Sequence, residues 1–184
     1  MFGKTKHIHF VGIGGIGMSG MAELLHSLGF SISGSDKSFS ERTHHLSSLG
    51  IKIFEGHHEK NVKTCDVLVY SSAVRLDNPE IGAAQSRNIP VIRRAEMLGE
   101  LLKLKPISIA VGGTHGKTTT SSMLGSILTS ANIHPTLVIG GIVNDLASNM
   151  ITGSGDIILV EADEFDRSFL SLNPTMTIVT NIDL

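Results

Sequence analysis

Two glycine-rich turns, each placed between an apolar strand pattern and a helical pattern, constrain this chain more than any other feature. The first turn reads GIGGIG at residues 12–17, and the second reads GGTHGKT at residues 112–118. The first N–H groups of a helix lack intrahelical partners, so a glycine turn that opens a helix can bring them close to an anion. The sequence therefore predicts two α/β units, each with a phosphate-binding turn.

Short apolar, β-branched runs alternate with helical patterns, which is typical of parallel sheets with helical crossovers. In the first half we predict strands at residues 7–11, 31–34, 51–54, 66–70 and 90–92, with helices at 18–28, 79–87 and 94–103. In the second half we predict strands at 107–111, 136–141, 156–163 and 176–183, with a helix at 117–130. The fold class expected is a Rossmann-like parallel-sheet domain followed by a P-loop α/β domain.

The segment KLKP at residues 103–106 separates the two patterns, because Pro106 and the short basic stretch interrupt the regular alternation. We place the boundary between residues 104 and 105, which gives domains 1–104 and 105–184. The sequence stops directly after a strand, and a parallel sheet needs cover on both faces. The second domain is therefore expected to be truncated.

Composition narrows the function classes. A hydrophobic content of 41% and a charged content of 17% favour a packed globular protein. A net charge of -2 without runs of Lys or Arg argues against nucleic acid and anionic membranes as partners. Cys65 is the only cysteine, which excludes an internal disulfide and favours a reducing compartment. Without a signal-peptide pattern we expect a cytoplasmic protein, and nothing in the sequence indicates its oligomeric state.

The first turn has the pattern G-x-G-x-x-G with glycines at 12, 14 and 17. Gly12 permits the tight turn, Gly14 lets a diphosphate approach the backbone, and Gly17 lets the helix pack against the strand. Asp36 ends the next predicted strand, near the place where an acidic residue contacts a ribose hydroxyl. The alternatives are a tight structural turn and a solvated Asp36, and the pattern leaves the nucleotide open.

The second turn resembles a P-loop, although Val111 stands where that motif has its first glycine. Lys117 would contact the β- and γ-phosphates, N–H groups from Gly113 to Lys117 would surround phosphate oxygens, and Thr118 would offer its hydroxyl to Mg²⁺. His115 lies inside the turn, and a loop-shaping role and a catalytic role both remain open for it.

Acidic residues follow a predicted strand in the segment VEADEFD, at Glu161, Asp163, Glu164 and Asp166. Carboxylates at the carboxyl end of a strand beside a P-loop strand are suited to hold Mg²⁺. The alternative is a solvated acidic turn. We predict that Glu161 completes the metal site that Thr118 begins.

Weaker candidates lie elsewhere. Histidine pairs at residues 44–45 and 57–58 are interpreted as surface positions, because adjacent residues point apart and no further ligands accompany them. Ser71 and Ser72 follow a predicted strand at the edge where open α/β sheets bind ligands. Substrate contacts and ordinary loop serines are equally compatible with these two residues.

The combination of both turns with its surrounding motifs resembles the Mur ligases, the ATP-dependent amide-forming enzymes of bacterial peptidoglycan synthesis. The resembling segments are HIHFVGIGGIGMSGMAELL, GSD, DNPE, RRAEML, GTHGKTTT, EADEFDRSFL and TIVTNID. Val111 in place of the first glycine also matches this family. The opening GIGGIGMSG favours the branch that adds alanine.

The resemblance implies a role for each motif. The first domain would bind the UDP part of the substrate through Gly12, Ile13, Gly14, Gly15, Ile16, Gly17, Ser35, Asp36 and Ser71. ATP would be bound by Gly113, Thr114, His115, Gly116, Lys117, Thr118 and Thr119, with Lys117 and His115 as catalytic residues and Thr118 and Glu161 at Mg²⁺. The family often has Ser where this chain has Phe165, which leaves any role of that side chain open.

The family reaction transfers the γ-phosphoryl group of ATP to the lactyl carboxylate of UDP-N-acetylmuramate, and the amine of L-alanine then attacks the acyl phosphate. Because the family continues beyond residue 184, the chain is expected to bind the UDP-substrate weakly through its first domain but not to form the amide. The alternatives are a ligase that attaches a recycled peptide, an NAD-dependent dehydrogenase, and a nucleotide-sensing module without catalysis.

Overall fold

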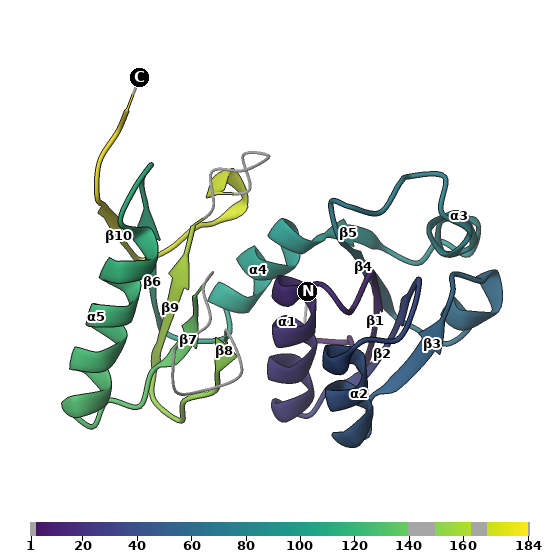
Figure 1. Ribbon diagram of the computed structural model, residues 1–184, viewed down its shortest axis with the longest axis horizontal. Helices are drawn as coiled ribbons and strands as arrows, with labels where there is room; N and C mark the ends of the chain where they lie inside the picture. The colour runs from purple at the N-terminus through teal and green to yellow at the C-terminus, as the bar shows by residue number, and fades with distance from the viewer. Residues whose placement is uncertain (1–2, 140–149, 163–168, 184) are drawn as a thin grey trace. The chain divides into compact units, whose positions relative to one another are not determined.

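The computed structural model describes residues 3–139, 150–162 and 169–183, and the chain divides into two compact units, Met1–Met97 and Leu98–Leu184 (Figure 1). Each unit is built on a five-stranded sheet. The prediction of two successive α/β units is therefore confirmed. The division falls inside helix α4 (Arg94–Leu102), so the proposed boundary between residues 104 and 105 stays a prediction.

The first sheet is entirely parallel, with the strand order β3-β2-β1-β4-β5. Helices α1 and α2 lie on one side of it, and α3 lies on the other (Figure 1). The order in which the chain visits the strands reverses between β1 and β4, and open sheets of this kind bind ligands beyond the carboxyl ends of the strands at that point. The strands are β1 (His7–Val11), β2 (Ser31–Asp36), β3 (Lys52–Glu55), β4 (Val67–Tyr70) and β5 (Val91–Arg93), and the helices are α1 (Ile16–Ser27), α2 (Glu41–Ser48), the short 3₁₀ helix η1 (Glu59–Val62) and α3 (Pro79–Ser86).

The second sheet has the order β10-β6-β9-β7-β8, so the P-loop strand β6 lies between β9 and β10 and runs parallel to both. Its elements are β6 (Ile107–Gly112), α5 (Lys117–Ser130), β7 (Thr136–Val138), β8 (Met150–Ile151), β9 (Ile157–Glu161) and β10 (Met176–Val179). Strand β8 pairs antiparallel with β7. Strand β8 was not predicted, because a two-residue strand leaves no apolar run in the sequence.

Two further elements differ from the prediction. Helix α2 was not predicted, since it buries only Thr43 and Leu46 and its main signal is a capping box between Ser40 and Thr43. Strand β10 ends at Val179 instead of residue 183, because the residues after it turn toward the P-loop. Residues 140–141 and 163 of the predicted strands lie outside the described residues.

The core of the first unit includes Cys65, which is 6% exposed and packs with Leu68 and Ile81. Burial raises the pKa of the Cys65 thiol from 9.0 to about 11, so this thiol stays protonated and unreactive at neutral pH. Among the described residues, no helix has both the length and the apolar character needed to cross a bilayer.

Gly34 in β2 allows the first glycine turn to pack against the sheet. A Cβ atom added at Gly34 would lie 2.5 Å from Ile13 Cδ1 and 2.7 Å from the Phe10 carbonyl oxygen. We expect Gly34→Ala to lower the free energy of unfolding by about 1–3 kcal/mol, measured by urea denaturation, because this position is overpacked by any side chain.

Gly82→Ala is the matched control. Gly82 is exposed in α3 and an added Cβ would meet nothing within 4 Å. Alanine there is expected to raise the free energy of unfolding by about 0.5–1 kcal/mol, because it restricts the unfolded chain. Equal changes in the two variants would contradict the packing explanation for Gly34.

Candidate functional site

Both glycine turns open a helix whose N-terminus has no side-chain cap. Gly15 at α1 and Gly116 at α5 occupy the N-cap positions, and neither helix has an acidic residue in its first turn. Helices α2 and α3 differ, because Ser40 and Asn78 cap them and each has a glutamate in its first turn. The N-termini of α1 and α5 thus keep the unpaired N–H groups and positive dipole end that bind anions.

The first turn is tied to the end of β2. The N–H groups of Gly12 and Ile13 both donate to the Ser35 carbonyl oxygen, at 2.8 and 3.1 Å. Gly12 has a φ of +79°, which favours glycine. The Gly14 N–H donates to Asp36 Oδ2 at 2.7 Å. Four predicted site residues and Asp36 therefore meet in one turn, and the Asp36 carboxylate accepts an N–H group that the sequence had assigned to a diphosphate.

Two side chains flank this turn. The Ser71 N–H donates to the Val11 carbonyl at 3.2 Å, and Ser71 Cβ lies 3.3 Å from the place of a Cβ on Gly12. A Cβ on Gly17 would lie 3.0 Å from Arg94 Nη1. Gly17 therefore makes room for a guanidinium, and its role in helix-to-strand packing stays a prediction. Arg94 was missed as a site residue, although the motif RRAEML contained it, and a guanidinium suits a diphosphate.

The second turn is closed by its own lysine. Lys117 Nζ donates to the carbonyl oxygens of Gly113 at 2.5 Å and Thr114 at 3.3 Å. Gly113 and Gly116 have φ values of +129° and +80°, which explains the glycines at both positions. Thr119 is exposed in the first turn of α5. The sequence had assigned all five residues to ATP, and they lie together around one loop.

Residues beyond β10 hold the second turn in place. Thr180 Oγ1 donates to the His115 carbonyl at 2.6 Å, and the His115 N–H donates to Asn181 Oδ1 at 3.0 Å. A Cβ on Gly113 would overlap Thr180 Oγ1. Thr180 and Asn181 were missed as site residues, although the motif TIVTNID contained them. The His115 ring is exposed with Nε2 3.7 Å from Asp183 Oδ2, and its catalytic role stays a prediction.

The predicted metal pair is brought together. Thr118 Oγ1 donates to Glu161 Oε1 at 2.8 Å, across the carboxyl ends of β6 and β9. A hydroxyl and a carboxylate are oxygen ligands of the kind that Mg²⁺ prefers, so these residues fit that ion. Asp163, Glu164, Phe165 and Asp166 lie outside the described residues. In the part of the chain that the structure describes, no three His, Cys, Asp or Glu side chains form a metal cluster.

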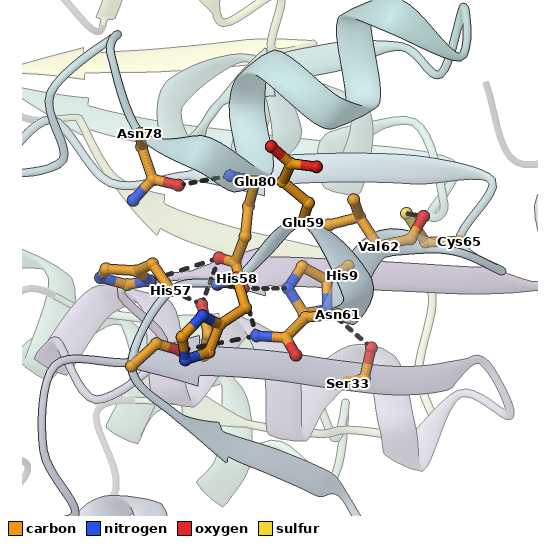
Figure 2. Close-up of polar contacts among 12 residues, drawn as sticks. His9, Ser33, His57, His58, Glu59, Asn61, Val62, Cys65, Asn78 and Glu80 are labelled. Atoms are coloured by element: carbon orange, nitrogen blue, oxygen red, sulfur yellow. Dashed lines mark hydrogen bonds and ion pairs between the residues drawn. The ribbon is translucent and has the colours of Figure 1, made fainter.

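The histidine pairs differ from one another. His44, His45 and His58 are exposed, as predicted. The His57 side chain is only 15% exposed, and its Nδ1 lies 3.3 Å from Glu80 Oε2 (Figure 2). The surface interpretation is therefore wrong for His57, because the chain after β3 turns inward against α3.

Glu80 is a fully buried carboxylate that the sequence did not single out. Burial raises its pKa, but the His9 imidazole 3.7 Å away and hydrogen bonds from Ser35 and Asn61 outweigh burial and lower the pKa from 4.5 to about 2. Glu80 is therefore ionised at neutral pH.

The sequence matches the family model described as "Mur ligase family, catalytic domain" over residues 7–106. The chain belongs to the Mur ligase family, which confirms the resemblance found in the sequence. It is 56% identical over 180 residues to the UDP-N-acetylmuramate--L-alanine ligase of Syntrophus aciditrophicus, and 58% identical over 183 residues to that of Geobacter sp. (strain M21). These matches cover 98% and 100% of this chain but 37% and 40% of the relatives, so the chain spans about two fifths of their length.

Two solved structures have a similar fold. The UDP-N-acetylmuramate-alanine ligase of Thermotoga maritima has a TM-score of 0.82 at 38% identity, and the match covers 96% of this chain and 41% of that chain. The UDP-N-acetylmuramate:L-alanyl-gamma-D-glutamyl-meso-diaminopimelate ligase of Neisseria meningitides has a TM-score of 0.85 at 29% identity, over 98% of this chain and 61% of that chain.

The low pKa of Glu80 predicts an acid-sensitive fold. Because the folded-state pKa lies below the unfolded value, the stabilisation is complete above pH 4.5 and is lost as the pH falls toward 2. In urea denaturation at each pH, wild type should lose on the order of 3 kcal/mol more than Glu80→Gln across this window.

Glu59→Gln is the control, because Glu59 is an exposed carboxylate in the neighbouring helix η1. Its pH curve should run parallel to that of wild type. A Glu80→Gln curve parallel to wild type would contradict an ionised, hydrogen-bonded Glu80.

Proposed function

We propose that this chain forms the UDP-substrate domain and the first part of the ATP domain of a ligase that joins L-alanine to UDP-N-acetylmuramate. The observation that carries the proposal is the pair of uncapped helix N-termini, one in each unit, because such termini bind phosphate groups. Two separate phosphate sites suit a reaction in which ATP activates a second substrate that bears a diphosphate of its own.

In the first unit, we assign the diphosphate of the UDP-substrate to the N-terminus of α1, next to Arg94. The turn residues Gly12 to Gly17 bring their backbone close to it. Asp36 already accepts the Gly14 N–H, so the N–H groups of the first turn of α1 are assigned to the diphosphate. Asp36 and Ser71, at the ends of β2 and β4, are assigned to the nucleoside part.

In the second unit, we assign ATP to the turn from Gly113 to Thr119. Lys117 now donates to two carbonyl oxygens of its own turn, and on binding it exchanges them for phosphate oxygens. Thr118 and Glu161 hold Mg²⁺. When bound, ATP and Mg²⁺ supply the phosphoryl group and the charge neutralisation that activate a carboxylate as an acyl phosphate. The N–H groups at the start of α5 and the Lys117 ammonium stabilise the same charge, and His115 is assigned a role beside them.

A second candidate is the ligase that attaches a recycled peptide, since such an enzyme from Neisseria meningitides has the same fold with a TM-score of 0.85. Identity of 29% to that protein, against 56–58% to the alanine-adding relatives, supports the alanine-adding assignment. A cytoplasmic location, without membrane or nucleic-acid partners, belongs to this proposal.

Binding calorimetry on the 184-residue chain tests the ligand of the first unit. UDP-N-acetylmuramate is expected to bind and NAD to give no heat, because the first turn is assigned to a UDP diphosphate. Binding of NAD without a response to the UDP-sugar would overturn the proposal in favour of a dehydrogenase.

Lys117→Ala tests the second unit in a complete ligase that contains this chain. Amide formation with saturating substrates is expected to fall about 10²–10³-fold, because a charge that stabilises the transferring phosphoryl group is lost. The affinity for UDP-N-acetylmuramate should not change, since that ligand is assigned to the other unit.

Lys103→Ala is the matched control, because Lys103 is exposed and its side chain pairs with Glu100, away from the turn. It should leave both measurements at wild-type values. Loss of both amide formation and UDP-N-acetylmuramate binding in Lys117→Ala would contradict the assignment of the two ligands to separate units.

A further inference from the structure

A buried polar cluster lies between the first sheet and α3, with the Glu80 carboxylate at its centre (Figure 2). Asn61 Nδ2 donates to Glu80 Oε1 at 2.6 Å, and Ser35 Oγ donates to Glu80 Oε2 at 2.5 Å. The His58 N–H donates to Oε1 at 3.4 Å, and His57 Nδ1 lies 3.3 Å from Oε2. Donors thus meet both oxygens, which is the environment of a carboxylate held as an anion.

Ser35 connects this carboxylate to the first glycine turn. Its side chain donates to Glu80, while its carbonyl oxygen accepts the N–H groups of Gly12 and Ile13. Ser35 is fully buried, so its orientation is set by these contacts. Any shift of Ser35 toward or away from Glu80 moves the acceptor on which the turn depends.

A chain of two imidazoles reaches Glu80 from the other side. His7 Nδ1 lies 3.0 Å from the Thr64 carbonyl, His7 Nε2 and His9 Nδ1 both lie 2.8 Å from Ser33 Oγ, and His9 Nε2 lies 3.7 Å from Glu80 Oε1. His9 Nε2 is buried and has no hydrogen-bond acceptor closer than this carboxylate in the described chain. The imidazole chain therefore ends beside the carboxylate without a hydrogen bond to it.

We infer that Glu80 is a positioning residue for the UDP-diphosphate turn, acting through the Ser35 side chain. The inference rests on the proposed function for the ligand, whereas the geometry of the turn is independent of it. Glu80 is not assigned any contact with the substrate.

Amide hydrogen exchange of the 184-residue chain tests the link without a ligand. Glu80→Gln should speed exchange of the Gly12 and Ile13 amides by about tenfold or more, because their common acceptor is released. The amides of the β1–β2 ladder should change less than these two. Ser35→Ala removes the same link without placing an amide in the cluster, so it serves where Glu80→Gln does not fold. Exchange at Gly12 and Ile13 that stays at the wild-type rate in the folded variant overturns the inference.

Calorimetry with UDP-N-acetylmuramate separates this inference from the proposed function. Wild type that binds no UDP-sugar contradicts the proposed function, while amide hydrogen exchange still decides the inference. If wild type binds UDP-N-acetylmuramate, the affinity of Glu80→Gln for it should be lower by about tenfold or more. The affinity of Glu59→Gln should equal that of wild type. Equal affinities in wild type and Glu80→Gln count against the inference alone.

Discussion

The first N–H groups of a helix have no acceptor within the helix, and this unmet requirement organises both units of the chain. At the start of α2 and of α3, a capping side chain accepts one of these N–H groups. At the start of α1 and of α5, each of which follows a glycine turn, no side chain does so. The glycines, the parallel strands and the short connections are all arranged around these two helix starts, and each lies at the carboxyl end of a central strand.

The two turns are held by different means. In the first unit the carbonyl of Ser35 accepts two N–H groups of the turn, and a buried carboxylate fixes the Ser35 side chain. In the second unit the side chains of Thr180 and Asn181 contact the backbone of His115. Both supports come from parts of the chain that are distant in sequence, so each turn has a fixed shape although it is rich in glycine.

Local sequence predicted the elements and the turns well, because strands, helices and glycine positions depend on periodicity and on backbone conformation within a few residues. Helix α2 was not predicted from the sequence, because its apolar stripe is short. Arg94, Glu80, Thr180 and Asn181 were missed for another reason, since sheet order and helix placement decide which residues meet a turn. Their motifs were visible in the sequence, but only three-dimensional contact explains them.

Val111 shows that core packing can determine which residue occupies a motif position. It stands where a general P-loop has glycine, and its side chain is fully buried in the core with Leu137 and Leu159. A strand position inside a core gains from an apolar side chain, so glycine is replaced there, whereas Gly113 faces Thr180 and admits no side chain.

The contact of Gly113 with Thr180 and Asn181 also has a consequence for synthesis on the ribosome. Strand β6 and the glycine turn emerge more than sixty residues before the segment that supports them, as the spacing of 65 positions between His115 and Thr180 shows. The first unit can close while the second is still being made, because all its strands precede residue 94. The nucleotide turn reaches its final shape only after β10 has been added beside β6. A correctly folded turn therefore requires a nascent chain that has been synthesised past Asn181.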